Sequence, residues 1–409
     1  MIKHLKHGQI GYFSMQVSIK DNEKCVFVVG SKGIPANYGG FETFIEKLTK
    51  YKKSDDIRYF VSCQKSANDD LDLYEYNGAI CFPIKVPNIG PAKAVYYDFK
   101  SFLWSISFIE KNKIKDAVIF ICACRIGPFI SLYHNKLKKL GIRLIINPDG
   151  HEWLRAKWNA AIKRYWRFSE KLCVKYADFL VCDSKNIEMY IKNQFKEFNP
   201  KTTFIAYGSD NSKSALSDDD NKIVDFYKKW DLKAKEYFVN IARIVPENNY
   251  ETMIREFMAS NTKKSFVICA SLKNCKFYDV LKKKLDFIND KRIKFVDGIY
   301  DQELLKKIRE NAFAYIHGHS VGGTNPSLLE ALGTLDLNLL YDCGFNKEVA
   351  EDGALYWNLD IGNLSKLINE TEKMSKDEVD RLGRLAKERI ANEYTWDKIC
   401  NEYEMVFKS

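Results

Sequence analysis

Two glycine-rich stretches of this sequence are suited to hold a phosphate group. The first, GSKGIPANYGGFETF at 30–44, follows an apolar run and ends in an amphipathic segment that is typical of a helix. Glycine lets the backbone turn sharply and approach a ligand, and the free amides at the start of a helix bind anions. Such glycines can also be purely structural, which stays an open reading for Gly30 and Gly33. For Gly39 and Gly40 we favour a loop that faces a ligand.

The second stretch, AYIHGHSVGGTNPSLLEALG at 314–333, carries more specific features. A strand is expected to end near His317, a glycine loop follows, and Pro326 suits the first turn of the next helix. Glu330 stands at S-x-x-E spacing from Ser327, so it could complete a capping box. Alternatively, it could accept hydrogen bonds from ribose hydroxyls while loop and helix amides surround a diphosphate. We favour the second reading, because a cap rarely needs a glycine loop before it.

A third motif, NPDGHEWLRAKW at 147–158, lies where a predicted strand ends. Asp149 and His151 are candidates for orienting an acceptor or for catalysis. Glu152 and Arg155 are candidates for contacts with a sugar or a phosphate of the acceptor. An aspartate before a glycine also shapes turns, and a lone histidine is often structural, so both alternatives remain open.

Short β-branched or aromatic runs alternate with helix-period segments along most of the chain. This alternation predicts parallel sheets that are covered by helices on both faces. A polar stretch at 207–221 divides the strands into two series. We therefore expect an α/β protein with two doubly wound domains, at 21–206 and 207–388, and a helical tail at 389–409. Residues 1–20 are expected to form an N-terminal extension. Ligands of such sheets bind at the carboxyl ends of the strands and in the cleft between two domains.

The composition narrows the class of protein. Of the 409 residues, 46% are hydrophobic and 29% charged, so the chain can bury cores and is not disordered. The eleven cysteines lack zinc-site spacing and several lie in apolar runs, which favours buried thiols in a reducing compartment. The acidic run at 218–220 falls in the junction, and no metal site is expected. No apolar stretch is long enough to span a bilayer, and the first residues lack the apolar region of a secretory signal.

A basic, aromatic stretch at 155–176 is predicted to form one helix. Its apolar stripe would comprise Ala161, Tyr165, Phe168, Leu172 and Tyr176. From His151 to Lys175 there are seven Lys or Arg and two Glu, which accounts for half of the formal net charge of +10. One reading is a surface for anionic membrane lipid, formed by Trp158, Lys163, Arg164, Trp166 and Arg167. The other reading is a core helix with a solvated basic face. No nucleic-acid-binding module is recognisable, so we expect no nucleic-acid partner.

Three motifs together resemble retaining glycosyltransferases of the GT-B fold, family 4, and within it a bacterial rhamnosyltransferase group. The sequence has GSKGIPANYGGFET at 30–43, NPDGHEWLRAKW at 147–158 and GHSVGGTNPSLLEA at 318–331, in the order that is typical of that group. The resemblance implies two Rossmann-like domains that face a cleft, with the C-terminal helix packing back on the first. It further implies a nucleotide-sugar donor bound mainly by the second domain, an acceptor bound mainly by the first, and no metal or other cofactor.

The resemblance also implies roles for single residues. Gly39 and Gly40 would lie near the donor phosphates, Arg243 would grip the diphosphate, and Glu330 would hold the ribose. The implied donor-binding set comprises Gly39, Gly40, Arg243, Asn248, His319, Gly322, Gly323, Thr324, Asn325 and Glu330.

Two positions depart from the family pattern. Asn248 lies near the place where the wider family usually has a lysine, and Gly322 stands where it often has a first glutamate. The contact of that glutamate with the sugar ring would then come from elsewhere or from loop amides around Gly323 and Thr324.

The expected function is transfer of L-rhamnose from dTDP-β-L-rhamnose to a lipid-linked saccharide, with retention, as a β-1,4-rhamnosyltransferase of bacterial cell-surface polysaccharide synthesis. A retaining enzyme needs no separate base, because the leaving diphosphate can take the acceptor proton. In an inverting enzyme, Asp149 or His151 would have to act as the base. The expected place is the cytoplasm, at the inner face of the plasma membrane. Alternatives are a UDP-hexose donor, a nucleotide-sugar epimerase, a nicotinamide oxidoreductase, which the missing GxGxxG disfavours, and a non-catalytic sugar- or lipid-binding scaffold.

Overall fold

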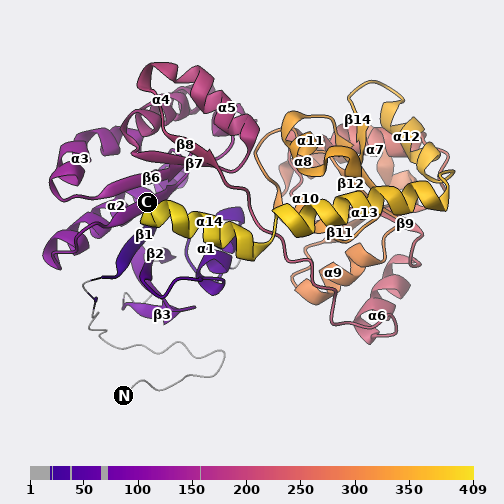
Figure 1. Ribbon diagram of the computed structural model, residues 1–409. Helices are drawn as coiled ribbons and strands as arrows, with labels where there is room; N and C mark the ends of the chain where they lie inside the picture. Colours follow the sequence, from indigo (N-terminus) through magenta and orange to yellow (C-terminus); the bar gives the residue numbers. More distant parts are fainter. Residues whose placement is uncertain (1–18, 21, 37–38, 66–71, 157) are drawn as a thin grey trace. The chain divides into compact units, whose positions relative to one another are not determined.

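The chain folds into two compact units, each with a sheet of its own. The computed structural model describes residues 19–20, 22–36, 39–65, 72–156 and 158–409. The first unit holds the described residues up to Trp153, residues 158–207 and Trp396–Ser409; the second holds 154–156 and Gly208–Thr395 (Figure 1). The division after residue 207 lies one residue from the expected boundary. The predicted N-terminal extension at 1–20 lies almost entirely outside the described residues.

The first unit is built on a mostly parallel sheet. Eight strands among its described residues pair in the order β3-β4-β2-β1-β5-β6-β7-β8, with β3 antiparallel to β4 and the other neighbours parallel. The elements in chain order are β1 (Lys24–Val29), α1 (Gly40–Lys50), β2 (Ile57–Lys65), β3 (Tyr74–Tyr76), β4 (Ala79–Lys85), η1 (Gly90–Ala92), α2 (Lys93–Lys111), β5 (Val118–Cys122), α3 (Gly127–Lys139), β6 (Arg143–Asn147), η2 (Glu152–Leu154), α4 (Ala160–Tyr176), β7 (Phe179–Cys182), α5 (Lys185–Gln194), η3 (Lys196–Phe198), β8 (Thr202–Phe204) and α14 (Trp396–Lys408).

Both faces of this sheet are buried, as the apolar strands require. On one face, Phe27 of β1 belongs to a core that includes Phe102 of α2, Ile130 of α3, Cys173 of α4 and Ile187 of α5. The opposite face is covered by α1 and by the C-terminal helix α14, which lies beside α1 and β1 (Figure 1). The chain therefore winds helices onto both sides of the sheet.

The last helix shows how a distant segment becomes part of the first unit. Its buried residues recur at helical spacing and comprise Trp396, Ile399, Cys400, Tyr403 and Phe407. The ring of Tyr403 packs 4.9 Å from that of Phe44 on α1, and the ring of Phe407 packs 6.2 Å from that of Tyr59 on β2. The tail was expected to begin at 389. The segment that joins the first unit instead begins at Trp396, because residues up to Glu393 continue a helix of the second unit.

The second unit repeats the architecture with a parallel sheet. Among its described residues, six strands pair in the order β11-β10-β9-β12-β13-β14. Its elements are α6 (Asn221–Trp230), β9 (Tyr237–Ile241), η4 (Pro246–Asn248), α7 (Tyr250–Ala259), β10 (Ser265–Ala270), α8 (Lys276–Leu285), η5 (Phe287–Asn289), β11 (Ile293–Asp297), α9 (Gln302–Glu310), β12 (Ala314–His317), α10 (Pro326–Leu332), β13 (Asn338–Tyr341), α11 (Gly344–Ala350), η6 (Glu351–Gly353), β14 (Leu355–Trp357), α12 (Asn363–Thr371) and α13 (Lys376–Glu393). Helix α7 lies beside α8 and α12, while α6 lies beside α9 and α10 beside α13.

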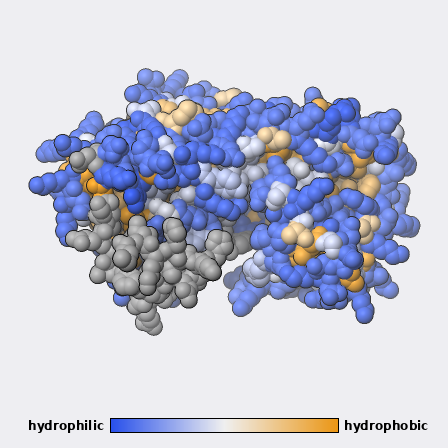
Figure 2. All heavy atoms as spheres, turned by 60° about the horizontal axis from the view of Figure 1, so that its bottom comes forward, coloured by the Kyte–Doolittle hydropathy of each residue, from blue (hydrophilic) through white to orange (hydrophobic). Residues whose placement is uncertain are grey.

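The surface is mostly hydrophilic on the face drawn in Figure 2, as expected when the apolar residues lie mainly in the two cores. Figure 2 shows a face covered mostly by hydrophilic residues, with hydrophobic atoms in small separate patches. Within the described part of the chain, no helix has both the length and the apolar character that crossing a membrane would need.

Candidate functional site

The second sheet has a topological switch point between β9 and β12. From β9 the chain adds β10 and β11 on one side, and then returns to add β12, β13 and β14 on the other. The loops that follow β9 and β12 therefore diverge at the carboxyl edge of the sheet, where open α/β sheets bind ligands. These two loops contain Arg243 and the GHSVGGTN segment, so the fold brings the predicted donor-binding residues of the second unit to one place.

The loop after β9 is fixed by two asparagine side chains. Asn248 is buried and donates from Nδ2 to the carbonyl of Arg243 over 2.8 Å, while Asn249 donates to the carbonyl of Gly318 over 2.9 Å. A Cβ on Gly318 would lie 2.3 Å from the carbonyl oxygen of Asn248, so only glycine lets the two loops approach this closely. Because the Asn248 amide is used inside the loop, the structure favours a positioning role for Asn248 over direct contact with a donor.

Arg243 lies in the loop after β9, at the carboxyl edge of the second sheet. Its side chain is exposed, and no carboxylate of the described residues forms an ion pair with it. Burial, together with the nearby charge of Arg243, lowers the pKa of His319 to about 3. At neutral pH the loop therefore offers an uncharged imidazole close to an unpaired guanidinium, an arrangement suited to a phosphate group.

His319 is held by a short polar chain beneath it. Its ring stacks on that of His317 with 4.3 Å between centroids, and His317 Nδ1 lies 3.3 Å from the hydroxyl of Tyr315. That hydroxyl is 3.1 Å from Ser327 Oγ, which donates to the carbonyl of Ile241. Burial lowers the pKa of His317 well below its usual value. The chain links the ends of β9 and β12 to the first turn of α10.

Helix α10 begins as its sequence predicts. Asn325 is the N-cap, and its side chain accepts from the amide of Leu328 over 3.2 Å, with Pro326 at the first helical position. Asn325, which the resemblance places in the donor-binding set, thus uses its side-chain oxygen to cap the helix. Gly322 has φ +133° and nothing within 4 Å of the place a Cβ would take, so the loop backbone is open there. Gly323 is half-buried and Thr324 is buried.

Glu330 is bound by a residue that the sequence did not indicate. Its Oε2 accepts from Nη2 of Arg309 on α9 over 2.5 Å; the Glu330 side chain is 37% exposed and that of Arg309 4%. The capping-box alternative for Glu330 is wrong, because Asn325 is the cap and Ser327 is bonded to Ile241. No local pattern in the sequence of α9 points to Arg309, since its partner lies 21 residues away.

The first sheet has its switch point between β1 and β5, and a largely buried ion pair lies there. Gly30 follows β1 with φ +99°, and a Cβ on it would lie 2.4 Å from the carbonyl oxygen of Cys122. Arg125, just after β5, donates from Nη1 to Asp98 over 2.9 Å and to the Gly30 carbonyl over 3.0 Å. The structural reading of Gly30 therefore holds. Sequence reasoning missed both Asp98 and Arg125, because α2 and β5 lie far apart in the chain.

The conformation at the start of α1 accounts for Gly39 but not for Gly40. Gly39 has φ +134°, and a Cβ there would meet Glu42 Oε2, while Glu42 Oε1 accepts from the amide of Lys32 over 2.7 Å. The fold itself thus accounts for glycine at 39. Gly40 has nothing within 4 Å of the place that a Cβ would take, so a ligand can approach its backbone. Residues 37 and 38 of this motif lie outside the described residues.

Asp149 shapes the turn after β6. Its φ is +60°, its amide donates to Asn147 Oδ1 over 2.8 Å, and its own Oδ1 accepts from the amide of Gly150. The turn alternative for Asp149 is therefore realised. Its charge also helps to raise the pKa of Arg125, so the two residues lie close to each other at this edge of the sheet.

His151 belongs to a cluster of aromatic side chains around a buried acid. Its ring lies 4.3 Å from that of Tyr190 and 5.6 Å from that of Trp153. The Tyr190 hydroxyl donates to Glu170 over 2.8 Å, and burial raises the pKa of Glu170 to about 7. Burial also lowers the pKa of His151, so its imidazole is neutral at pH 7 and able to accept a proton.

The other two predicted acceptor residues separate. Glu152 accepts from Nε1 of Trp158 over 3.0 Å within the first unit. Arg155 is half-buried and groups with the second unit. The structure thus gathers Asp149, His151 and Glu152 in one unit, and Arg155 in the other.

The basic stretch begins its helix later than expected. Helix α4 starts at Ala160, because Asn159 caps it by accepting from the amide of Ile162 over 3.0 Å, and residues 152–154 form the separate turn η2. Trp166 is 8% exposed and packs inside the first unit, so its assignment to a membrane surface is wrong. Trp158 is half-buried against Glu152.

The buried face of α4 is also not the predicted stripe. The residues that it buries are Trp166, Ser169, Glu170, Cys173 and Val174. Phe168, expected in the core, is 55% exposed. The exposed side chains around it define the basic face of α4 and comprise Arg164, Arg167, Phe168, Lys171 and Lys175. Lys163 is half-buried, and the guanidinium of Arg167 lies 4.2 Å from the centroid of the Trp153 ring.

Comparisons with known proteins address the fold. Residues 23–210 match a family described as a domain of unknown function (DUF1972). No curated protein sequence matches the chain. Sucrose-phosphate synthase from Thermosynechococcus elongatus superposes with a TM-score of 0.76 at 15% identity, over 94% of this chain and 98% of that one. The trehalose-6-phosphate synthase OtsA gives 0.72 at 13% (95% and 99% covered), and Anabaena HepE in complex with UDP gives 0.67 at 12% (94% and 99%). Two Rossmann-like units that match these structures over nearly their whole length give the chain the GT-B fold.

Proposed function

We propose that the protein is a glycosyltransferase that uses a nucleotide sugar as its donor. The observation that carries the proposal is the edge of the second sheet, where exposed Arg243 lies near neutral His319 and Glu330 follows one turn into α10. Similar structures support it: HepE was solved with UDP, the Burkholderia xenovorans enzyme is a UDP-forming trehalose-phosphate synthase, and the Escherichia coli enzyme was solved with UDP-2-fluoro glucose.

In the proposed complex, Arg243 neutralises the diphosphate and stabilises the negative charge that grows on it as the glycosidic bond breaks. Glu330 accepts hydrogen bonds from the sugar hydroxyls of the nucleotide, which are the 2′- and 3′-hydroxyls in UDP and the 3′-hydroxyl in dTDP. The open backbone at Gly322 approaches the phosphates or the transferred sugar. The acceptor oxygen bonds to the anomeric carbon on the face from which the diphosphate leaves, and the diphosphate takes the acceptor proton there. The anomeric configuration is therefore retained. The proposed reaction needs no metal ion, because Arg243 supplies the positive charge.

For the donor we propose dTDP-β-L-rhamnose, from the resemblance carried by the motifs at 30–43, 147–158 and 318–331. The runner-up is a UDP-hexose, which the UDP-related structural neighbours favour. The proposed acceptor is a lipid-linked saccharide of bacterial cell-surface polysaccharide synthesis, joined in a β-1,4 linkage.

The proposed acceptor side is the carboxyl edge of the first sheet. Arg125, Asp149 and His151 follow neighbouring strands β5 and β6 there, and they combine a cation, a carboxylate and a neutral imidazole. These groups suit the hydroxyls of a saccharide. His151 would orient the attacking hydroxyl, and it would act as the base only if the reaction inverted configuration.

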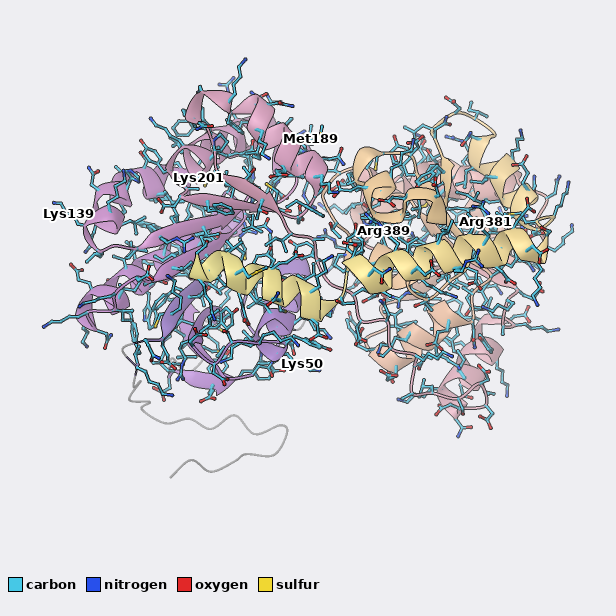
Figure 3. All side chains as sticks on the ribbon, in the orientation of Figure 1. Lys50, Lys139, Met189, Lys201, Arg381 and Arg389 are labelled. Carbon is cyan, nitrogen blue, oxygen red and sulfur yellow. The ribbon has the colours of Figure 1, made fainter. Side chains whose placement is uncertain are left out.

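The proposed location is the inner face of the plasma membrane, reached from the cytoplasm. The basic face of α4 supports it, since an exposed phenylalanine among four exposed cations suits an anionic lipid surface. Lysines at the end of the neighbouring helix α3 add to the charge, and Lys139 lies at its outer end (Figure 3).

A donor panel tests the proposal. The purified protein is incubated with UDP- and dTDP-sugars and a lipid-linked saccharide, and release of the nucleoside diphosphate is measured, with Arg243→Ala as the matched inactive variant. We expect release of the nucleoside diphosphate with dTDP-rhamnose. The new glycosidic bond of the product should have the same anomeric configuration as the donor. Turnover with a UDP-sugar alone would replace the donor assignment. No release with any donor and acceptor pair would overturn the function.

A further inference from the structure

We propose that Arg309 is a positioning residue for the nucleotide site, and that it holds the Glu330 carboxylate in the orientation that binds the sugar hydroxyls of the nucleotide. The inference rests on the proposed function and assigns a role to a residue that lies in none of the three motifs. Arg309 belongs to α9 and Glu330 to α10, and the ion pair joins these two helices, which precede and follow β12 in the chain.

The burial of the two partners is unequal. Arg309 is 4% exposed, and its Nε is buried without a hydrogen-bond partner among the described residues. A buried guanidinium is costly unless it is well paired, and its charge here is compensated by the Glu330 carboxylate alone among the ion pairs of the described residues. Among the hydrogen bonds of the described residues, the bond to Glu330 is the one that the five N–H groups of this guanidinium make.

The geometry leaves the other side of Glu330 available. Oε2 of Glu330 bonds to the buried guanidinium, and the Glu330 side chain is 37% exposed. A glutamate on a helix surface has several rotamers, and a carboxylate that must choose among them loses entropy on binding a ligand. The bond to Arg309 removes that choice before the ligand arrives, which is how supporting residues preorganise a site.

Arg309 also lies near the hydrogen-bonded side chains that lead to His319. Arg309 is close enough to Tyr315 to oppose the rise of its pKa, and the Tyr315 hydroxyl contacts both His317 and Ser327. Arg309 thus lies close to Tyr315 as well as to Glu330, and among the hydrogen bonds of the described residues its side chain bonds to Glu330 alone. The effect of Arg309 on binding should therefore depend on the sugar hydroxyls of the nucleotide.

The test measures binding of three probes to the full-length protein by titration calorimetry. The probes are UDP or dTDP, whichever binds the unaltered protein more tightly; its 2′,3′-dideoxy counterpart; and inorganic diphosphate. The variants are Arg309→Met, Arg309→Lys, Glu330→Gln and the double variant Arg309→Met/Glu330→Gln. Lys306→Met is the matched control, because Lys306 is a cation on the same helix that pairs with Asp210 and Glu303 instead.

We expect Arg309→Met to weaken binding of the nucleotide on the order of tenfold. The affinities for the dideoxy nucleotide and for diphosphate should stay within about twofold of those of the unaltered protein. The double variant should be no weaker than Glu330→Gln, and Arg309→Lys should recover part of the loss. Lys306→Met should change nothing. Equal weakening of all three probes, or no weakening of the nucleotide, would overturn the positioning role. If the unaltered protein bound the nucleotide no better than diphosphate, the proposed nucleotide site itself would fall, and this inference with it.

Discussion

Arg309 donates to Glu330 across two helices over 2.5 Å, and the cation is the more deeply buried partner of the pair. The relationship ties the stability of the second unit to the residue that we assign to the ribose. Removing either partner should therefore affect folding as well as binding, but not equally, because only one of the two would be left as a charge in the protein interior.

Glu330→Ala is expected to lower the free energy of unfolding of the second unit by about 2 kcal/mol, because it leaves the buried Arg309 without a counter-charge. Arg309→Met should cost less, since Glu330 can turn to water. Urea unfolding followed by circular dichroism measures both, and the double variant Arg309→Met/Glu330→Ala should recover at least half of the loss. A double variant that equals the sum of the single ones would show that the pair is not coupled.

The loop pairing around Gly318 makes a second prediction. Gly318→Ala would place a Cβ 2.3 Å from the carbonyl oxygen of Asn248, so the loop that carries Arg243 must shift. Asn248→Ala would remove the bond that holds the Arg243 carbonyl. Both variants should weaken nucleotide binding by about ten- to a hundredfold while the thermal unfolding midpoint changes little, since loop displacement misplaces the diphosphate-binding guanidinium. Unchanged nucleotide affinity in both variants would show that this loop does not position the donor.

The fold was predictable because it depends on local patterns. The alternation of apolar runs with helix-period segments predicted two doubly wound α/β units, and this is confirmed. Pro326 at the start of α10 was readable for the same reason, because a proline there acts on its own turn. The later start of α4 also follows from a local signal, because Asn159 is a good cap before Ala160.

The contacts of the site could not be predicted in the same way. The pairs Arg309–Glu330 and Asp98–Arg125 join residues of separate elements, and no spacing rule relates them. The buried face of α4 was misread because Ser169 and Glu170 are polar. Glu170 is buried because Tyr190, from the next helix, donates to it. Tertiary packing determines which polar residues of a helix are buried, and this packing cannot be predicted from the spacing of residues in one sequence.

Glu170 gives a prediction about pH. Burial raises its pKa from 4.5 in the unfolded chain to about 7 in the folded one. Between these values the folded state binds the extra proton, so this carboxyl stabilises the fold at low pH and the stabilisation is lost as the pH rises through 7. Relative to Glu170→Gln, the wild-type protein should lose about 3 kcal/mol of unfolding free energy between pH 4.5 and pH 8. Urea unfolding of both proteins at several pH values measures the difference, and the other titrating groups cancel in it. A difference that does not change with pH would contradict the burial of an ionisable carboxyl here.

The basic face of α4 gives the last prediction. Arg164 and Lys175 are exposed on the same helix as Phe168, which is 55% exposed. Each cation near an anionic bilayer contributes about 1 kcal/mol, so Arg164→Glu/Lys175→Glu should weaken binding to vesicles that contain phosphatidylglycerol by at least about tenfold. Phe168→Ser should weaken it further, and salt should weaken the binding of the unaltered protein.

The matched control for that experiment is Lys282→Glu/Lys283→Glu, which makes the same change of charge on exposed residues of α8 in the second unit. Net charge alone would reduce vesicle binding equally in both double variants, because a distributed positive charge attracts an anionic surface wherever it lies. Loss in the α4 variant and retention in the α8 variant would assign the membrane contact to α4. Equal loss in both would leave α4 as a core helix with a solvated basic face, and the lipid-linked acceptor would then need another route to the first unit.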